Sequence, residues 1–300
     1  MTKASLYIMV GTAGSGKSTI ANSLAHSEGA VVLSSDELRK EFTGSYQPSE
    51  DVNAKVFGYM FSESRRLLDE GKSVVYDATN LSRRRRAHLY KMAHRVGAEV
   101  IIHLVCTSYA DCVSRNAQRE RKVPNDVILK QYRSLQIPRV GVDCDRVVAH
   151  NMQSCVSEML SHVDMPHDTP WHEESVMEHI KWAEELASKC DEHAEILREV
   201  ARFHDLGKFM TRKVNERGIA SYRNHEFVSS LYFVAYSYAK GRTLGEAHTA
   251  LVAEIIYQHM NAHRGFTSKM CKANNLGELE LELLDKFEHI DSSARISSLG

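Results

Sequence analysis

The chain has 300 residues, enough for two domains of ordinary size, and its 43% apolar and 26% charged residues are typical of folded, globular protein. Its 38 lysines and arginines nearly balance its 39 acidic residues. This balance excludes the class of strongly basic proteins that bind nucleic acid through their overall positive charge. No apolar run approaches the roughly 20 residues of a membrane span, and the first residues lack the core of a signal peptide. With six cysteines in no paired motif, these features favour a soluble cytoplasmic protein without a membrane partner.

Short apolar runs alternate with helical patterns in the first half of the chain. Strands are predicted at residues 6–10, 30–33, 73–76, 100–105 and 146–149. Helices are predicted between them, at residues 17–25, 53–68 and 83–96. This alternation predicts an α/β domain, in which a parallel sheet is flanked by helices on both faces.

The loop after the first predicted strand carries the sequence Gly11-Thr12-Ala13-Gly14-Ser15-Gly16-Lys17-Ser18. Its GxxxxGK[ST] pattern lets backbone N–H groups converge on phosphate oxygens at the N-terminus of a helix. We expect Lys17 to reach the β- and γ-phosphates of ATP, and Ser18 to bind Mg²⁺. The residues expected to bind the nucleotide here are Gly14, Ser15, Gly16, Lys17, Ser18 and Thr19.

Acidic residues follow the second and third predicted strands, at Asp36 and Asp77. Ligands of open α/β sheets bind at the carboxyl ends of the strands, so Asp36 could take the proton of an attacking hydroxyl as a general base. A helix N-cap without a catalytic part is the alternative for Asp36. Arg39, one helical turn later, could hold a phosphate of the acceptor, and Asp77 could orient Mg²⁺-bound water or acceptor groups.

Two arginine-rich stretches lie further along the chain. Residues 83–86 are all arginine, which fits either the solvated face of a helix or a patch that binds a polyanion. Residues 114–122 combine several cations with a helical pattern. We expect this second stretch to form a lid, in which Arg115 and Arg119 close over the triphosphate and stabilise the charge of the transferred group.

Together these motifs resemble the phage-type polynucleotide 5′-hydroxyl kinase, over about residues 5–140. The resemblance rests on the phosphate loop, on Asp36-x-x-Arg39, on Asp77-x-Thr79-Asn80, and on Arg115-Asn116-x-x-Arg119 before Val123-Pro124. The roles that it implies are Lys17 and Ser18 on the phosphate donor, Asp36 as base, Arg39 on the acceptor phosphate, Asp77 near the acceptor, and Arg119 as lid arginine with Arg115 assisting.

The regular pattern lapses around residues 136–166, and the sequence then changes character. We place the domain boundary there, with a P-loop kinase-like domain at residues 1–150 and a second domain at residues 151–300. Helices are predicted in the second domain at residues 175–189, 194–202, 225–238, 244–257 and 279–290. The second domain is therefore expected to be nearly all helical.

Histidines beside acidic residues are concentrated in this helical domain. The adjacent His204 and Asp205 offer a nitrogen and an oxygen ligand to one divalent cation. Further candidate ligands before and after them are His179, His225, His259 and Asp291. The alternative is a helical domain whose surface histidines bind no metal, and exposed positions on helices are expected for His172, His263 and His289.

The order His, His-Asp, His, His, Asp resembles HD-domain phosphohydrolases, over about residues 165–297. The metal ligands that this resemblance implies are His179, His204, Asp205 and Asp291 for one ion, with His225 and His259 suited to a second. It also implies that Lys208 lies near the scissile phosphate. A transition metal such as Mn²⁺, Ni²⁺, Co²⁺ or Zn²⁺ would lower the pKa of its bound water for attack on phosphorus.

Both resemblances together imply a bifunctional enzyme that heals RNA or DNA ends, of phage or bacterial origin. The kinase would phosphorylate 5′-hydroxyl ends, and the HD domain would remove 2′,3′-cyclic or terminal phosphate. The chain lacks the Asp-x-Asp-x-Thr phosphatase signature of the commoner phage enzymes. Two alternatives stay open: a small-molecule or nucleoside kinase fused to a nucleotide phosphohydrolase, and an HD domain that serves only as a binding scaffold. The sequence also leaves open the choice between RNA and DNA and the oligomeric state.

Overall fold

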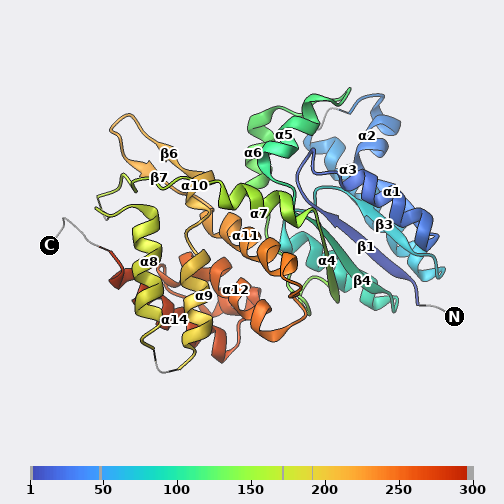
Figure 1. Cartoon of the computed structure of the whole chain (residues 1–300). Helices are drawn as coiled ribbons and strands as arrows, with labels where there is room; N and C mark the ends of the chain where they lie inside the picture. The colour runs from blue at the N-terminus through green and yellow to red at the C-terminus, as the bar shows by residue number, and fades with distance from the viewer. Residues whose placement is uncertain (1–2, 47–48, 171, 191, 296–300) are drawn as a thin grey trace. The chain divides into compact units, whose positions relative to one another are not determined.

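The computed structural model describes residues 3–46, 49–170, 172–190 and 192–295, which separate into two compact units (Figure 1). One unit comprises Met1–Gln131 with Pro138–Met152, and the other comprises Tyr132–Ile137 with Gln153–Gly300. None of the helices in the described ranges combines the length and the apolar character needed to cross a membrane.

The first unit is built on a parallel sheet of five strands in the order β2-β3-β1-β4-β5. The strands are β1 (Ser5–Val10), β2 (Val31–Ser34), β3 (Val74–Asp77), β4 (Glu99–Val105) and β5 (Arg146–His150). All six residues of the central strand β1 are buried, as expected for a strand covered on both faces. The predicted parallel α/β sheet is thus confirmed.

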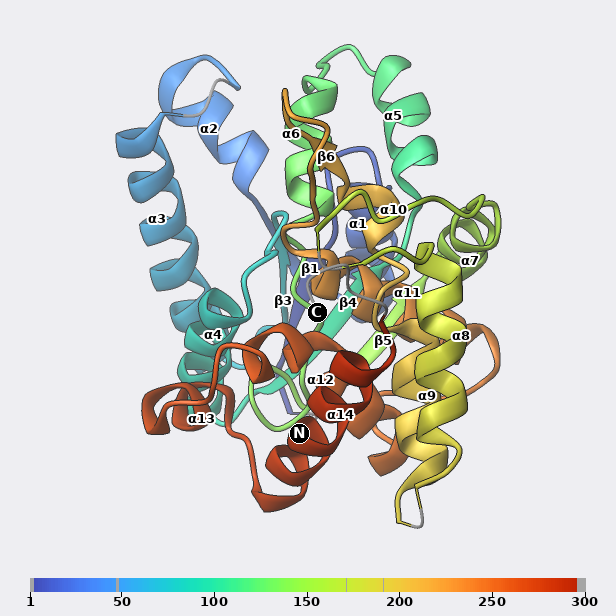
Figure 2. The same ribbon diagram turned by 90° about the vertical axis from the view of Figure 1, so that its left-hand side faces the viewer.

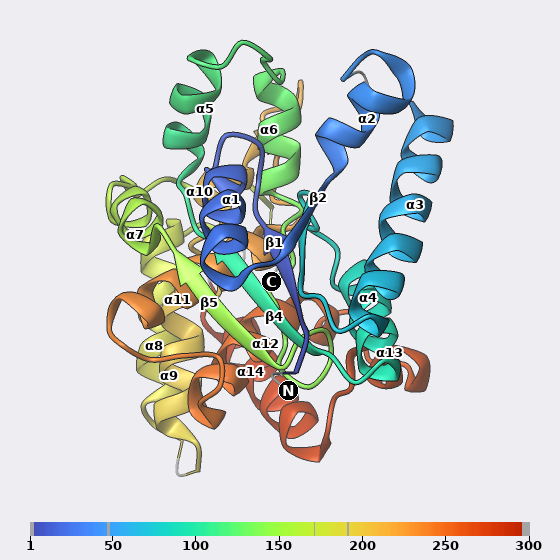
Figure 3. The same cartoon turned by 90° about the vertical axis from the view of Figure 1, so that its right-hand side faces the viewer.

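Helices cover both faces of this sheet. The helices of this unit are α1 (Lys17–Glu28), α2 (Ser35–Thr43), α3 (Glu50–Asp69), α4 (Arg83–Arg95), α5 (Tyr109–Ala117) and α6 (Asn125–Tyr132), of which α1, α3 and α4 lie along the strands. Figure 3 shows α1 on one side of the sheet and α3 and α4 on the other, the arrangement that right-handed crossovers produce when the chain reverses direction after β2. Because the strands are parallel, the loops after β1, β2 and β3 meet at one edge of the sheet, where the candidate site lies.

The face of the sheet under α1 holds a compact apolar cluster. Ala21 on α1 packs against Met9, Val75 and Ile101, which are all fully or almost fully buried. Each large apolar side chain buried in this way contributes about 1.5–3 kcal/mol to folding. This packing fixes α1, and with it the loop that precedes α1.

The arginine run at the start of α4 is neither a solvated face nor a single anion-binding patch. Arg86 is fully buried and pairs with the equally buried Asp143, with 2.7 Å between Nη2 and Oδ2. It also donates to the carbonyl oxygen of Asn80 at 2.8 Å, so it fixes the loop after β3. Arg83 is buried as well, whereas Arg85 lines the cleft described below. A buried pair of this kind is costly to break because the remaining charge would have no partner.

The second unit is helical, as predicted, apart from one short antiparallel strand pair. Its elements are α7 (Met152–Leu160), α8 (Val176–Ala187), α9 (Ala194–Phe203), α10 (Lys208–Thr211), β6 (Lys213–Val214), β7 (Ala220–Ser221), α11 (His225–Ala239), α12 (Ala247–Ala262), α13 (Ser268–Asn274) and α14 (Glu278–Ser293). Figure 2 shows α8, α9, α12 and α14 packed side by side. The start of α8 is set by a capping box between Ser175 and Glu178.

Candidate functional site

The loop between β1 and α1 has a backbone that only glycine tolerates at its centre. Gly14 has φ +80°, and a Cβ atom there would lie 2.2 Å from the carbonyl oxygen of Cys112. Gly16, the residue before α1, is also left-handed, with φ +96°. The carbonyl of Ser15 accepts hydrogen bonds from Thr107 and from Arg115, at 2.9 and 3.1 Å. The loop therefore forms a preshaped cradle at a helix N-terminus, which suits a phosphate group.

Three predicted residues meet at the mouth of this cradle. Ser18 donates its hydroxyl proton to Oδ2 of Asp77 at 2.9 Å, so the start of α1 and the end of β3 are joined. Lys17 is almost buried, and its ammonium donates to the carbonyl of Thr12 at 2.6 Å. Burial lowers the pKa of Lys17 and raises the pKa of Asp77. The charge of Asp77 partly offsets the first shift, and the charge of Lys17 partly offsets the second. A hydroxyl and a carboxylate side by side are suitable ligands for Mg²⁺.

Asp36 lies in the first turn of α2, held by two arginines. Arg39 Nη1 lies 2.5 Å from Oδ1 of Asp36, and Arg121 Nη1 lies 2.6 Å from Oδ2. Burial would raise the pKa of Asp36, but the hydrogen bond and charge of Arg121, with the charge of Arg39, lower it below its ordinary value. The N-cap of α2 is Ser34, so the N-cap alternative for Asp36 is wrong.

These residues line one cleft of about 1000 Å³. Seven cationic residues and two acidic residues border it: Lys17, Arg39, Arg85, Arg115, Arg119, Arg121 and Lys122, with Asp36 and Asp77. The excess of positive charge matches a polyphosphate ligand. All the residues expected to bind the nucleotide line the cleft except Ser15, which belongs to the same loop but is fully buried.

Three residues of the cleft make contacts that were not predicted, although Arg121 lies in the stretch expected to form the lid. Arg121 donates to the backbone carbonyl of Tyr46 at 3.2 Å, besides its ion pair with Asp36. Gln131 accepts from the backbone N–H of Ala13 in the phosphate loop at 2.8 Å, and Asn53 accepts from Arg39 at 3.0 Å. Their partners lie far away in the sequence, and no motif signals such a contact.

A second site lies within the helical unit, where four histidines from separate elements converge. Each donates from Nδ1 to a backbone carbonyl at 2.7–2.9 Å; the pairs are His179 with Ala294, His204 with Ala201, His225 with Tyr222 and His259 with Ile256. A neutral imidazole has only one N–H, so in each of these rings Nε2 carries the lone pair when Nδ1 is the donor. The Nε2 atoms face one another in two pairs, 3.2 Å apart for His179 and His204, and 3.0 Å apart for His225 and His259. Facing lone pairs repel, so this arrangement suits a cation between them.

Two carboxylates complete this cluster. Asp205 places Oδ2 3.3 Å from Nε2 of His204 and Oδ1 3.1 Å from Nε2 of His225, so it joins both histidine pairs. Asp291 Oδ1 lies 2.8 Å from Nε2 of His179. His179, His204 and Asp205 form one group close enough to hold a metal ion, Asp205, His225 and His259 form another, and Asp291 adjoins the first. Imidazole and carboxylate ligands of this kind suit divalent transition metals.

The two carboxylates of the cluster also favour a positive charge beside them. Burial alone would lower the pKa of His204, but Asp205 and Asp291 raise it to about 10. Burial would raise the pKa of both acids, yet the surrounding histidines, with Lys208 beside Asp205, hold it well below the ordinary value. The buried carboxylate of Asp205 and the partly buried carboxylate of Asp291 thus attract positive charge, which a proton or a metal ion can supply.

The six candidate metal ligands therefore lie together, and Lys208 adjoins them with Nζ 2.6 Å from Oδ2 of Asp205. Of the three histidines expected on exposed positions, only His289 is well exposed. His263 Nε2 lies 2.6 Å from Oδ2 of Asp291, and His172 is mostly buried against Glu174. Sequence spacing gave no signal for these two contacts.

The sheet order, the phosphate loop and the cationic cleft define a P-loop domain. The sequence model of a family described as "AAA domain" matches residues 6–138, less than half of the chain. The matched segment contains all but the first residue of β1, the strands β2 to β4, the phosphate loop, Arg115 and Arg119. Fold and family match together fit a kinase-like P-loop domain in the first unit.

Solved structures resemble parts of the chain. A chain of the Pnkp1/Rnl/Hen1 RNA repair complex is 26% identical, with 45% of each chain covered and a TM-score of 0.39. A gluconokinase from Sinorhizobium meliloti 1021 is 22% identical over 50% of this chain and 83% of its own, with a TM-score of 0.37. A sugar kinase from Janibacter sp. HTCC2649 is 15% identical over 52% of this chain and 93% of its own, with a TM-score of 0.38. Each likeness is limited to about half of this chain.

Proposed function

We propose that the chain is a bifunctional enzyme that heals nucleic-acid ends. Residues 1–150 would phosphorylate 5′-hydroxyl ends of RNA or DNA with ATP. Residues 151–300 would act as an HD-type phosphohydrolase on 2′,3′-cyclic or terminal 2′- or 3′-phosphates. The observation that carries the proposal is the presence, on one chain, of a cationic cleft around a phosphate loop and a separate convergent cluster of four histidines and two aspartates.

In the kinase reaction, the phosphate loop and Lys17 would hold the β- and γ-phosphates of ATP, while Ser18 and Asp77 would hold Mg²⁺. The bound Mg²⁺ supplies charge neutralisation of the phosphates. Asp36 would accept the proton of the 5′-hydroxyl, which its low pKa allows because the carboxylate stays ionised at neutral pH. Arg39 would orient an acceptor phosphate. Arg119, with Arg115, would stabilise charge on the transferred group.

In the hydrolytic reaction, the six ligands of the cluster would hold one or two divalent cations. Such cations supply a bound water of lowered pKa and neutralise the phosphoester oxygens. The four Nδ1–H donors fix each imidazole with Nε2 turned toward the cluster, which prepares the ligands before any metal binds. Lys208 would donate a hydrogen bond to a phosphate oxygen of the substrate.

The test uses one substrate that reports both reactions: an RNA oligonucleotide with a 5′-hydroxyl and a 2′,3′-cyclic phosphate. We expect γ-labelled ATP with Mg²⁺ to label its 5′ end, and added Mn²⁺, Ni²⁺ or Co²⁺ to promote loss of the cyclic end. If no oligonucleotide is labelled, and ATP is consumed only when a small hydroxyl compound is supplied, the first unit is a small-molecule kinase. If metal binds stoichiometrically but no phosphoester is hydrolysed, the helical unit is a binding scaffold.

A further inference from the structure

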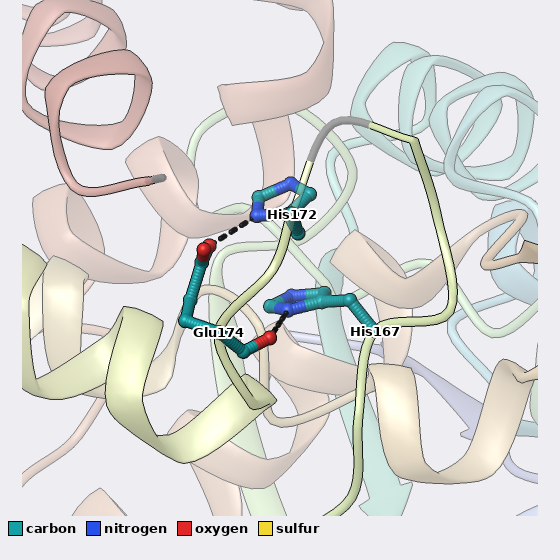
Figure 4. Close-up of side chains that lie close together, drawn as sticks. All are labelled: His167, His172 and Glu174. Atoms are coloured by element: carbon teal, nitrogen blue, oxygen red, sulfur yellow. Dashed lines mark hydrogen bonds and ion pairs between the residues drawn. The ribbon is translucent and has the colours of Figure 1, made fainter. Parts of the chain in front are cut away.

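A group of three polar residues adjoins the histidine and aspartate cluster without supplying ligands to it. His167, His172 and Glu174 precede α8, and their side chains lie close enough together to hold a metal ion. The Glu174 carboxylate lies 2.5 Å from Nδ1 of His172, and Nδ1 of His167 donates to the backbone carbonyl of Glu174 at 2.9 Å. Figure 4 shows both contacts. The two imidazole rings stack with centroids 4.0 Å apart and an angle of 18°.

The second nitrogen of His167 decides what this group does. Because Nδ1–H donates to a carbonyl, Nε2 carries a lone pair, and that lone pair accepts a hydrogen bond from the Lys208 ammonium at 3.0 Å. A divalent cation on the same lone pair would have to displace the ammonium and lie beside its positive charge. The geometry thus opposes a third metal site and makes His167 a hydrogen-bond acceptor for Lys208.

Lys208 is held from two directions. Its Nζ lies 2.6 Å from Oδ2 of Asp205 and 3.0 Å from Nε2 of His167, and only 8% of the residue is exposed. An ammonium group has three N–H donors. Among residues 3–46, 49–170, 172–190 and 192–295, no third oxygen or nitrogen atom accepts from Lys208, so one N–H can reach a ligand.

The position of His167 is itself determined by its neighbours. The hydroxyl of Tyr222 donates to the backbone carbonyl of His167, and the Lys208 ammonium lies 5.5 Å from the centre of the Tyr222 ring. His172 covers one face of the His167 ring and is fixed in turn by the buried carboxylate of Glu174. His167 is therefore buried and oriented from the backbone, from its ring face and from both ring nitrogens.

We infer that His167 is a positioning residue for the hydrolytic reaction, which holds the Lys208 ammonium so that its remaining N–H is directed to a phosphate oxygen of the substrate. Asp205 alone would leave the ammonium free to rotate about the Cε–Nζ bond. A second fixed acceptor removes that rotation, and it does so without adding charge to the site. The inference rests on the proposed phosphohydrolase function of the helical unit.

The test compares His167→Leu, which removes the acceptor, with His167→Gln, whose amide oxygen can replace Nε2. Hydrolysis of 2′,3′-cyclic AMP by the metal-loaded full chain should fall about 10- to 100-fold in kcat/KM for His167→Leu and be largely restored in His167→Gln. Metal content should not change. In a Lys208→Met background, His167→Leu should have no further effect. His289→Leu, at an exposed histidine, should match the wild type.

Two outcomes would overturn the inference. Loss of a metal ion in His167→Leu, with metal binding retained by His289→Leu, would make His167 a metal ligand. An undiminished effect of His167→Leu in the Lys208→Met background would show that His167 acts without Lys208.

A second measurement separates this inference from the proposed function. Calorimetry in a Lys17→Ala background, which weakens the phosphate loop, would follow binding of inorganic phosphate to the metal-loaded chain. We expect His167→Leu to weaken that binding about tenfold or more. If the wild type hydrolyses no phosphoester, the proposed function fails, but the phosphate measurement still supports or refutes the pairing of His167 with Lys208.

Discussion

The two candidate sites of this chain are built in opposite ways. The cleft of the first unit is open and strongly cationic, and its cradle comes from eight consecutive residues whose backbone is set by glycine. The cluster of the second unit is largely buried, and its candidate ligands come from four helices and from the turn after α9, with His179 and Asp291 separated by 112 residues. One site depends mainly on local backbone conformation, and the other depends on how helices pack.

The largest effect is expected from Asp205→Ala, because this carboxylate touches both histidine pairs and Lys208. Its loss should lower metal-dependent phosphoester hydrolysis by about 10³-fold or more while 5′ phosphorylation stays near the wild-type rate. Chelation of the wild type should have the same selective effect on hydrolysis when Mg²⁺ is restored for the kinase assay.

The control for this prediction is Asp285→Ala, an exposed carboxylate on α14. Metal content measured by mass spectrometry should fall only in Asp205→Ala. Hydrolysis that survives in Asp205→Ala would refute the ligand assignment, and a parallel loss of kinase activity would show that the two sites are not independent.

The difference in construction explains how much of each site the sequence could predict. The phosphate loop was predictable in full because its residues are contiguous and because Gly14 and Gly16 adopt backbone conformations that other residues rarely adopt. The sheet was predictable from alternating apolar runs, although β2 begins at Val31 and includes Ser34. The six candidate metal ligands were named from their resemblance to the HD pattern, whereas the pairing of the four histidine Nε2 atoms depends on packing among α8, α9, α11, α12 and α14.

The reciprocal prediction is Lys17→Ala. Removal of the ammonium leaves the β- and γ-phosphates of ATP without their central cation, so phosphorylation of 5′-hydroxyl ends should fall about 10²- to 10³-fold. Hydrolysis should be unchanged. Label transfer and cyclic-phosphate loss, measured on the same oligonucleotide, check both statements, with the exposed Lys91→Ala on α4 as the matched control. Kinase activity that persists in Lys17→Ala would show that Lys17 does not hold the phosphates of ATP during the reaction.

Residues that act through distant partners were beyond prediction. Arg121 lies 75 residues from Tyr46, and Gln131 lies 118 residues from Ala13, yet each pair is hydrogen-bonded. His167 and Lys208 are 41 residues apart. A cation or an amide in a helical stretch is compatible with a solvated surface, so only the fold reveals that these side chains support a site.

The smallest effect is expected from Arg121→Ala, because Arg121 would act through Asp36 and not on the phosphates of ATP. Arg121 lowers the pKa of Asp36, so Arg121→Ala should raise it. Asp36 must be ionised to act as a base, and in the variant it would already become protonated at a higher pH. The acid limb of the kinase pH profile should therefore move to higher pH, while the rate near neutral pH falls only about 2- to 5-fold because the pair is partly exposed. Arg84→Ala, at an exposed position of α4, is the matched control. An unmoved acid limb would mean that Asp36 does not titrate in the rate-determining step, and the assignment of Asp36 as general base would have to be withdrawn.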